Sequence, residues 1–255
     1  MIKLLLIMEI VLSSISHLGL AEALRRKMGR CRLLWWNYLV ALIISMVIFG
    51  LRGIPEGEFS ISSLLNPVGM RNTDWYFTCI LLIGFATGIV YFANYVTIQR
   101  AIACSGASTS NTISRLGSFV IALLVSVLWN DHLTIFNLAG VLLACTAIFL
   151  FQDGNVQVSR ILPILFVISG FQNILKKLYV IADGGAFQTL YYLGIYIICL
   201  SGCTALLVYK KEKIVIQKGE VLIGAVIGVA SIFNTYSMIY MLRYLPVAIV
   251  TPIVS

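Results

Sequence analysis

Long runs without a charged side chain are the feature that most constrains how this chain can fold. The runs cover residues 33–51, 75–99, 116–130, 133–152, 184–209 and 221–242. Most of them approach the ~20 residues that an α-helix needs to cross ~30 Å of hydrocarbon. Further candidate spans carry isolated charges, and they cover residues 3–24, 105–129 and 160–182. Because 60% of the residues are apolar and only 11% are charged, we predict an all-α polytopic membrane protein.

The basic residues gather at the ends of the predicted helices, and the formal net charge is +8. The two groups are Arg25, Arg26, Lys27, Arg30 and Arg32, and then Lys210, Lys211, Lys213 and Lys218. Such groups are typical of short loops that set membrane topology, whereas a nucleic-acid surface spreads its charge over one face. We therefore expect a multi-pass protein in the lipid bilayer of the plasma (inner) membrane, with no nucleic acid as a partner.

The chain repeats itself. A shift of 140 positions places "GFATGIVYFANY" (84–95) over "GAVIGVASIFNT" (224–235), so that glycines fall on glycines and an asparagine on an asparagine. The matched residues are Gly84 and Gly224, Gly88 and Gly228, and Asn94 and Asn234. A shift of 156 lays "VLSSISH" (11–17) over "VISGFQN" (167–173). Each pair of glycines stands one helical turn apart, which predicts that a neighbouring helix backbone approaches closely there. A glycine hinge for gating is the alternative.

The repeat divides the chain into two copies, residues 1–155 and 156–255. The first copy is expected to hold helices at 2–24, 33–51, 74–99, 105–129 and 133–152. The second is expected to hold helices at 160–182, 186–209, 220–243 and from 245 onward. Five helices are an odd number, so the second copy is inverted in the membrane, and we predict two inverted five-helix repeats. By this count the sequence stops inside the ninth helix, and a tenth is missing.

Two stretches carry a resemblance to a known family. They are "LRYLPVAIVTPIVS" (242–255) and "LWNDHLTIFNLAGVLLACTAIFLF" (128–151), an acidic turn followed by a glycine-bearing helix. The chain resembles the EamA-type branch of the drug/metabolite transporter superfamily, which implies a ten-helix carrier built from two inverted repeats. It departs from that family at Asp131, where glutamate is usual. It also has Thr112 where the second copy has Pro252.

The resemblance and the charges disagree over orientation. The positive-inside rule assigns the basic loops to the cytoplasm, which puts the N-terminus outside. The family resemblance implies a cytoplasmic N-terminus. We take the charge count as the prediction, because these basic residues are on short loops, where the rule works.

Arg115 stands in the middle of a predicted helix. It is about ten residues, or roughly 15 Å, from the residue where that helix begins. It is expected to share a polar helix face with Ser108, Asn111 and Ser118. One interpretation is that Arg115 pairs with Glu9 or caps backbone carbonyls. The preferred one is that its planar fork binds a substrate carboxylate in a midplane cavity. The predicted substrate-binding residues are Arg115, Asn111, Asn94, Asn234 and Thr251, although the two repeat-related asparagines are equally suited to linking helices.

Polar residues also follow one face of the first predicted helix. Glu9, Ser13, Ser16 and His17 are spaced i, i+4, i+7 and i+8. Ionisable side chains inside a membrane usually face the bundle interior or water, which makes Glu9 and His17 candidates for proton coupling. Two other interpretations stay open: Glu9 reaching the membrane interface, and His17 serving as a neutral packing residue.

The sequence offers no sign of catalysis. It contains neither a phosphate-binding glycine loop nor an HExxH zinc motif, and we predict no enzyme activity, no cofactor and no metal site. The expected function is secondary transport of a small organic metabolite by alternating access, with a carboxylate-bearing small molecule as substrate. An integral-membrane enzyme acting on a lipid and a truncated, non-transporting fragment are the alternatives. Whether the protein forms a homodimer stays open.

Overall fold

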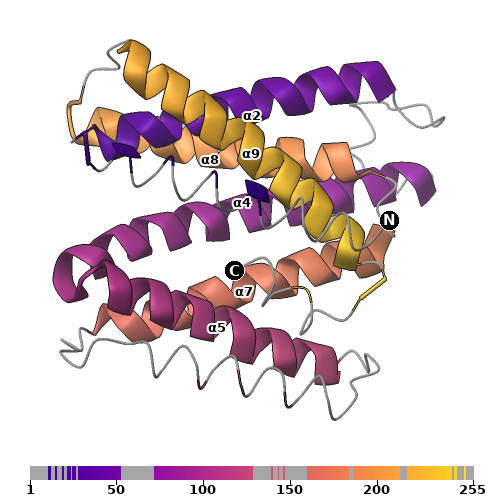
Figure 1. Cartoon of the computed structure of the whole chain (residues 1–255). Coiled ribbons are helices and arrows are strands. Elements are labelled where there is room, and N and C mark those ends of the chain that lie inside the picture. Colours follow the sequence, from indigo (N-terminus) through magenta and orange to yellow (C-terminus); the bar gives the residue numbers. More distant parts are fainter. Residues whose placement is uncertain are drawn as a thin grey trace. The chain divides into compact units, whose positions relative to one another are not determined.

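Helices form the framework of the chain in a computed structural model (Figure 1). The structure describes residues 11–12, 15, 19, 22–23, 25–26, 28–52, 72–128, 139, 143, 146, 160–183, 187–212, 217–242, 244–245 and 250. The helices in this part are α2 (Arg30–Arg52), α4 (Asn72–Ser105), α5 (Ala107–Leu128), α7 (Ile161–Asp183), α8 (Gln188–Tyr209) and α9 (Lys218–Leu242). These residues contain no β-strand. The predicted all-helical class is therefore confirmed for the described residues.

Five helices of this described part are long and apolar enough to cross a membrane. The spans are Arg30–Leu51, Phe77–Ser105, Ile161–Val180, Gln188–Tyr209 and Lys218–Leu242. They have between 20 and 29 residues, against the ~20 that cross ~30 Å of hydrocarbon. Their length and composition indicate a multi-pass membrane protein, as the charge-free runs predicted.

Gly106 separates α4 from α5. Its φ of +83° lies in the left-handed region, which glycine adopts without the steric cost that a Cβ atom brings. The Gly106 amide donates to the carbonyl of Ile102 at 3.1 Å, and Ser110 returns two hydrogen bonds to the carbonyl of Gly106. The break between the helices predicted at 74–99 and 105–129 is therefore local and hydrogen-bonded.

The chain forms two compact units, each described here by itself. Unit 1 comprises residues 1–10, 90–180 and 238–255, and unit 2 comprises residues 11–89 and 181–237. The described part of unit 1 contains the second half of α4, α5, α7 and the end of α9. That of unit 2 contains α2, the first half of α4, α8 and most of α9.

In unit 2, α4 lies directly on α8. A Cβ atom on Gly84 would stand 2.7 Å from the carbonyl oxygen of Tyr191, and one on Gly88 would stand 2.8 Å from that of Ile195. Real Cβ atoms do not approach an oxygen so closely, so these two positions admit only glycine at this helix separation. The predicted close approach of a neighbouring backbone is confirmed for this pair.

The second pair of glycines brings α9 onto α2 in the same way. A Cβ atom on Gly224 would stand 3.1 Å from the carbonyl oxygen of Leu33, and one on Gly228 would stand 2.7 Å from that of Asn37. The residue numbers of the contacting positions increase together along both helices, so α2 and α9 run parallel. The predicted backbone approach is confirmed here too.

Unit 1 is held by a third glycine contact, between α5 and α7. A Cβ atom on Gly117 would stand only 2.2 Å from the carbonyl oxygen of Phe166, and one on Gly170 would meet the Ile121 side chain at a similar distance. An apolar cluster of Ala101, Leu162 and Leu165 joins the end of α4 to the beginning of α7. These contacts set the positions of the polar side chains described next.

Candidate functional site

Unit 1 contains a network of serines and asparagines between α4, α5 and α7, formed by Asn94, Ser114, Ser118, Ser169 and Asn173. The Ser169 hydroxyl on α7 donates to Asn94 Oδ1 on α4 at 3.0 Å, and it lies 2.8 Å from the Ser114 hydroxyl on α5. A hydroxyl has one hydrogen to donate, and that of Ser169 is directed to Asn94. Ser114 is therefore the donor to Ser169.

Two further bonds of this network join α5 to α7 through backbone carbonyls. Ser118 donates to the Ser169 carbonyl at 3.4 Å, and the Asn173 amide donates to the Ser118 carbonyl at 3.3 Å. Bonds of this kind link helices inside a bilayer, where lipid offers no alternative partner. The network thus couples α4, α5 and α7 at one level of unit 1.

Lys176 continues the polar face of α7. It follows Ser169 by seven residues and Asn173 by three, spacings that place the three side chains on one helix face. Its ammonium lies 5.2 Å from the centroid of the Tyr91 ring and 3.1 Å from Met238 Sδ, and the residue is 7% exposed. A buried ammonium in a membrane helix is costly and marks a candidate functional position.

Asn111 and Arg115 are both exposed on α5. They stand one turn apart, as predicted, and away from the face that Gly117 presents to α7. Ser118, which was expected on the Arg115 face, instead bonds to α7. A step of three residues turns a helix about 60° short of a full circle, so Ser118 lies closer than Arg115 to the Gly117 contact, at the edge of the face that Asn111 and Arg115 share.

The repeat-related asparagines have different surroundings. Asn94 is a member of the network in unit 1, whereas Asn234 lies on α9 in unit 2. The Asn234 Oδ1 atom is buried and has no hydrogen-bond partner among the described residues. Both positions stay predicted substrate residues, but only Asn234 has an acceptor that is not already used.

Tyrosines of α8 and α9 form a hydrogen-bonded cluster. Its member on α9, Tyr236, is close to Asn234 in the sequence. Tyr192 on α8 donates to the Thr235 carbonyl at 2.9 Å and accepts a hydrogen bond from Gln188 at 2.8 Å. Its ring centroid lies 4.4 Å from that of Tyr236. The Tyr192 hydroxyl makes both of its hydrogen bonds within the cluster. Tyr192 therefore stabilises the packing of α8 on α9 and is not a candidate substrate-binding residue.

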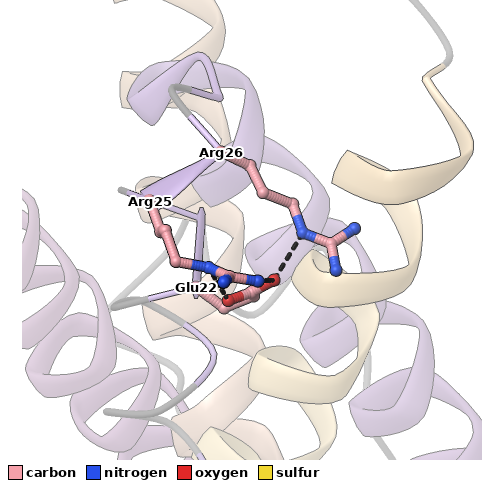
Figure 2. A network of polar contacts seen from close by, with 3 residues as sticks. All are labelled: Glu22, Arg25 and Arg26. Carbon is pink, nitrogen blue, oxygen red and sulfur yellow. Dashed lines mark hydrogen bonds and ion pairs between the residues drawn. The ribbon is translucent and has the colours of Figure 1, made fainter.

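The described residues at the end of the first predicted helix form an exposed ion cluster (Figure 2). Arg25 binds both carboxylate oxygens of Glu22, at 2.7 and 2.8 Å, and Arg26 binds one of them at 2.5 Å. The hydrogen bonds from Arg25 and then Arg26 lower the pKa of Glu22 from 4.5 to about 2. Glu22 therefore stays ionised well below neutral pH and reduces the local positive charge.

A second ion pair, partly buried, lies in unit 2. Glu220, in the first turn of α9, is fully buried, and its Oε1 accepts from Arg32 Nη2 at 2.9 Å and from the Gly29 amide at 3.1 Å. Glu220 Oε2 and Arg32 Nε are also buried, and neither has a hydrogen-bond partner in the described part of the chain. The pair is thus only half satisfied.

The remaining predicted site residues, Glu9, His17 and Thr251, lie outside the described residues. The structure brings Asn94, Asn111 and Arg115 into unit 1 and Asn234 into unit 2. Among the described residues no group of three or more histidines, cysteines, aspartates or glutamates is placed to hold a metal ion.

Sequence reasoning missed most of the network in unit 1. Its signals were present: Ser114 and Ser118 are one turn apart, and Ser169, Asn173 and Lys176 follow helical spacing. Serines are common in helices of every kind, so spacing alone does not show that two serine faces meet. The missing information was the Gly117 and Gly170 contact that brings α5 onto α7.

Comparison with known proteins adds no family or relative. No family model matches the chain, and no curated protein matches it.

Proposed function

We propose that this chain is a secondary transporter of the EamA type, which moves a small organic metabolite across the plasma membrane by alternating access between two inverted repeats. The membrane-spanning helices and the repeat at a shift of 140 positions are its starting points. The observation that carries it is the exchange of partners between the two glycine pairs in unit 2.

Repeat-related helices in unit 2 make the same contact with exchanged partners. Gly84 and Gly88 on α4 meet α8, and their counterparts on α9 meet α2. In the repeat, α9 is the counterpart of α4, and α8 is the counterpart of α2. The α4–α8 contact therefore becomes the α9–α2 contact when the two copies are interchanged.

The register of the contacts agrees between the two pairs. The carbonyls that meet the first pair of glycines belong to Tyr191 and Ile195, and those that meet the second pair belong to Leu33 and Asn37. Tyr191 follows Leu33, and Ile195 follows Asn37, by the same 158 positions. Any twofold axis that relates the two copies produces this exchange, and in carriers with inverted repeats that axis lies in the membrane plane.

The proposed substrate is a small carboxylate. Arg115 offers a planar fork that binds two oxygens at once, and Asn111 lies one turn away on the same exposed side of α5. The network with Asn94 and Ser114 links α5 to α7. Proton coupling through Glu9 and His17 completes the proposal.

The test is uptake of radiolabelled mono- and dicarboxylates into liposomes that contain the purified protein. We expect uptake well above that of protein-free liposomes. Because lysine keeps the charge but loses the fork, Arg115→Lys should reduce uptake at least about tenfold, a loss of ~1.4 kcal/mol in substrate stabilisation. Arg100→Lys is the matched control, since Arg100 is also exposed in unit 1 but stands at the end of α4.

Two results would contradict the proposal. Uptake no faster than in protein-free liposomes for every carboxylate would exclude this substrate class. Normal uptake by a well-expressed Arg115→Ala protein would reject Arg115 as the binding group.

A further inference from the structure

The partly buried pair of Arg32 and Glu220 stands at one end of the α2–α9 contact. Arg32 directly precedes Leu33, the first residue of α2 whose carbonyl meets a glycine of α9. Glu220 precedes Gly224 by four residues, which is one helical turn. The pair therefore lies just beyond the glycine contact, where the first turns of both helices meet.

The corresponding end of the α4–α8 contact is apolar. The shift of 158 positions between the contacting carbonyls relates Arg32 to Leu190, and the shift of 140 between the glycines relates Glu220 to Ile80. Both of these side chains are buried. An ion pair thus occupies this end of the α2–α9 contact, and aliphatic side chains occupy the corresponding end of the α4–α8 contact.

We infer that the Arg32–Glu220 pair is a one-sided lock, which holds the first turns of α2 and α9 together on one membrane face, while aliphatic packing closes the other face. This inference rests on the proposed function, because inverted repeats place the two contact ends on opposite faces. The same opening movement then breaks an ion pair on one face and separates aliphatic side chains on the other.

The hydrogen bonds that this ion pair lacks make it easier to separate. One carboxylate oxygen of Glu220 and one nitrogen of Arg32 are buried without a hydrogen bond in the described residues. Burial of the Glu220 carboxylate and of part of the Arg32 guanidinium costs hydration, which their attraction offsets only in part when some atoms stay unsatisfied. Water that enters as the helix ends separate solvates both groups and so offsets part of the cost of breaking the pair.

A native thiol is placed to report the opening. Cys31, next to Arg32, is buried in the closed form, and its sulfur lies 3.2 Å from Lys210 Nζ. Cys199 is also buried, but it lies in the middle of α8, and its thiol donates to the Gly88 carbonyl at the glycine contact. A lock that opens at one end exposes Cys31 and leaves Cys199 buried.

The experiment uses two full-length single-cysteine proteins in detergent, one retaining Cys31 and one retaining Cys199, with a water-soluble maleimide as the probe. We expect Glu220→Gln and Arg32→Gln each to raise the labelling rate of Cys31 at least about fivefold, as a conformational coupling of ordinary size would. The rate for Cys199 should stay unchanged. Glu212→Gln, which removes an exposed carboxylate beyond the end of α8, is the matched control and should change neither rate.

A double variant separates a lock from a merely structural ion pair. Arg32→Leu with Glu220→Ile gives this end the residues of the aliphatic end, and buried pairs often tolerate such a replacement. We expect the labelling of Cys31 to return to the wild-type rate or below. Equal acceleration at both cysteines in the single variants, or no acceleration at Cys31, would overturn the lock. Labelling requires no substrate, so a failure of uptake in liposomes is a separate result that bears on the proposed function.

Discussion

Glu22 shows how far two arginines shift a single carboxyl group. The pKa of this carboxyl is lowered to about 2 by hydrogen bonds from Arg25 and Arg26, so its stabilising contribution is complete above the unfolded value of 4.5. That contribution is lost as the pH falls from 4.5 through about 2. We therefore expect Glu22 to be ionised at pH 3.5, which a carboxyl-carbon NMR titration of the selectively labelled protein measures.

Variants of the two arginines test the cause of that shift. Arg25 makes the larger contribution because it binds both oxygens of Glu22. Arg25→Gln should therefore raise the pKa of Glu22 more than Arg26→Gln does. The reverse order, or a titration midpoint near 4.5 in the unmodified protein, would show that the cluster does not form in solution.

The repeat-related asparagines should respond differently to the same substitution. Asn94→Leu removes the acceptor of the Ser169 hydroxyl, and interhelical hydrogen bonds in membranes contribute roughly 1 kcal/mol each. Asn234→Leu removes an Oδ1 atom that has no partner in the described residues. We expect a lower midpoint of thermal unfolding in detergent for Asn94→Leu and a smaller change for Asn234→Leu. Equal losses would contradict the difference between the two sites.

At the residue scale, the sequence could indicate which side chains are polar but not which of them meet. The pairing of Asn94 with Asn234 came from the repeat, yet their different surroundings depend on contacts with Ser169, 75 positions away from Asn94. Arg32 was recognised as one member of a basic group. Its partner Glu220 lies 188 positions away, and no local pattern connects them.

At the scale of the helix, the predicted elements agree with the structure because hydrophobic length is a local property. The helix predicted at 33–51 runs over Arg30–Arg52, and that predicted at 186–209 runs over Gln188–Tyr209. The helix predicted at 74–99 continues to Ser105, since Arg100 at its polar end does not stop a helix. The helices predicted at 2–24 and 133–152 lie mostly outside the described residues, and they stay predictions.

The glycine contact between α5 and α7 gives a prediction at the same scale. Gly117→Ala places a methyl group against the Phe166 carbonyl, which forces the two helices apart, and overpacking of this kind costs roughly 1–3 kcal/mol. Gly50→Ala is the matched control, because nothing lies within 4 Å of a Cβ atom there. It should not destabilise the protein, because alanine has the higher helix propensity. Thermal unfolding in detergent compares them, and a Gly117→Ala protein as stable as Gly50→Ala would refute the close contact.

At the scale of the whole molecule, sequence and structure contribute different parts of the argument. The repeat at a shift of 140 positions predicts that two copies are related, and an odd number of helices predicts inversion. Neither says which helices touch. The exchange of partners between the glycine pairs supplies that information within unit 2, because contacts between helices depend on folding and not on local sequence.

Orientation in the membrane is the last prediction, and it decides on which side the lock opens. The exposed Arg25 and Arg26 and the exposed Lys210 and Lys211 lie at one end of unit 2, where Lys210 contacts Cys31. Glu22 binds two of these arginines, but acidic residues contribute little to topology, so the positive-inside rule still places this end in the cytoplasm.

Cysteine labelling in intact cells tests that placement in proteins that each retain a single cysteine. Met28→Cys, at the basic end, should react with a membrane-impermeant maleimide only after permeabilisation. Phe187→Cys should react in intact cells, because it precedes the 22 residues of α8, roughly 33 Å of helix, that end beside the basic cluster. Labelling of position 28 from outside would reverse the assignment. It would place the N-terminus in the cytoplasm, as the family resemblance implies, and move the Arg32–Glu220 lock to the external face.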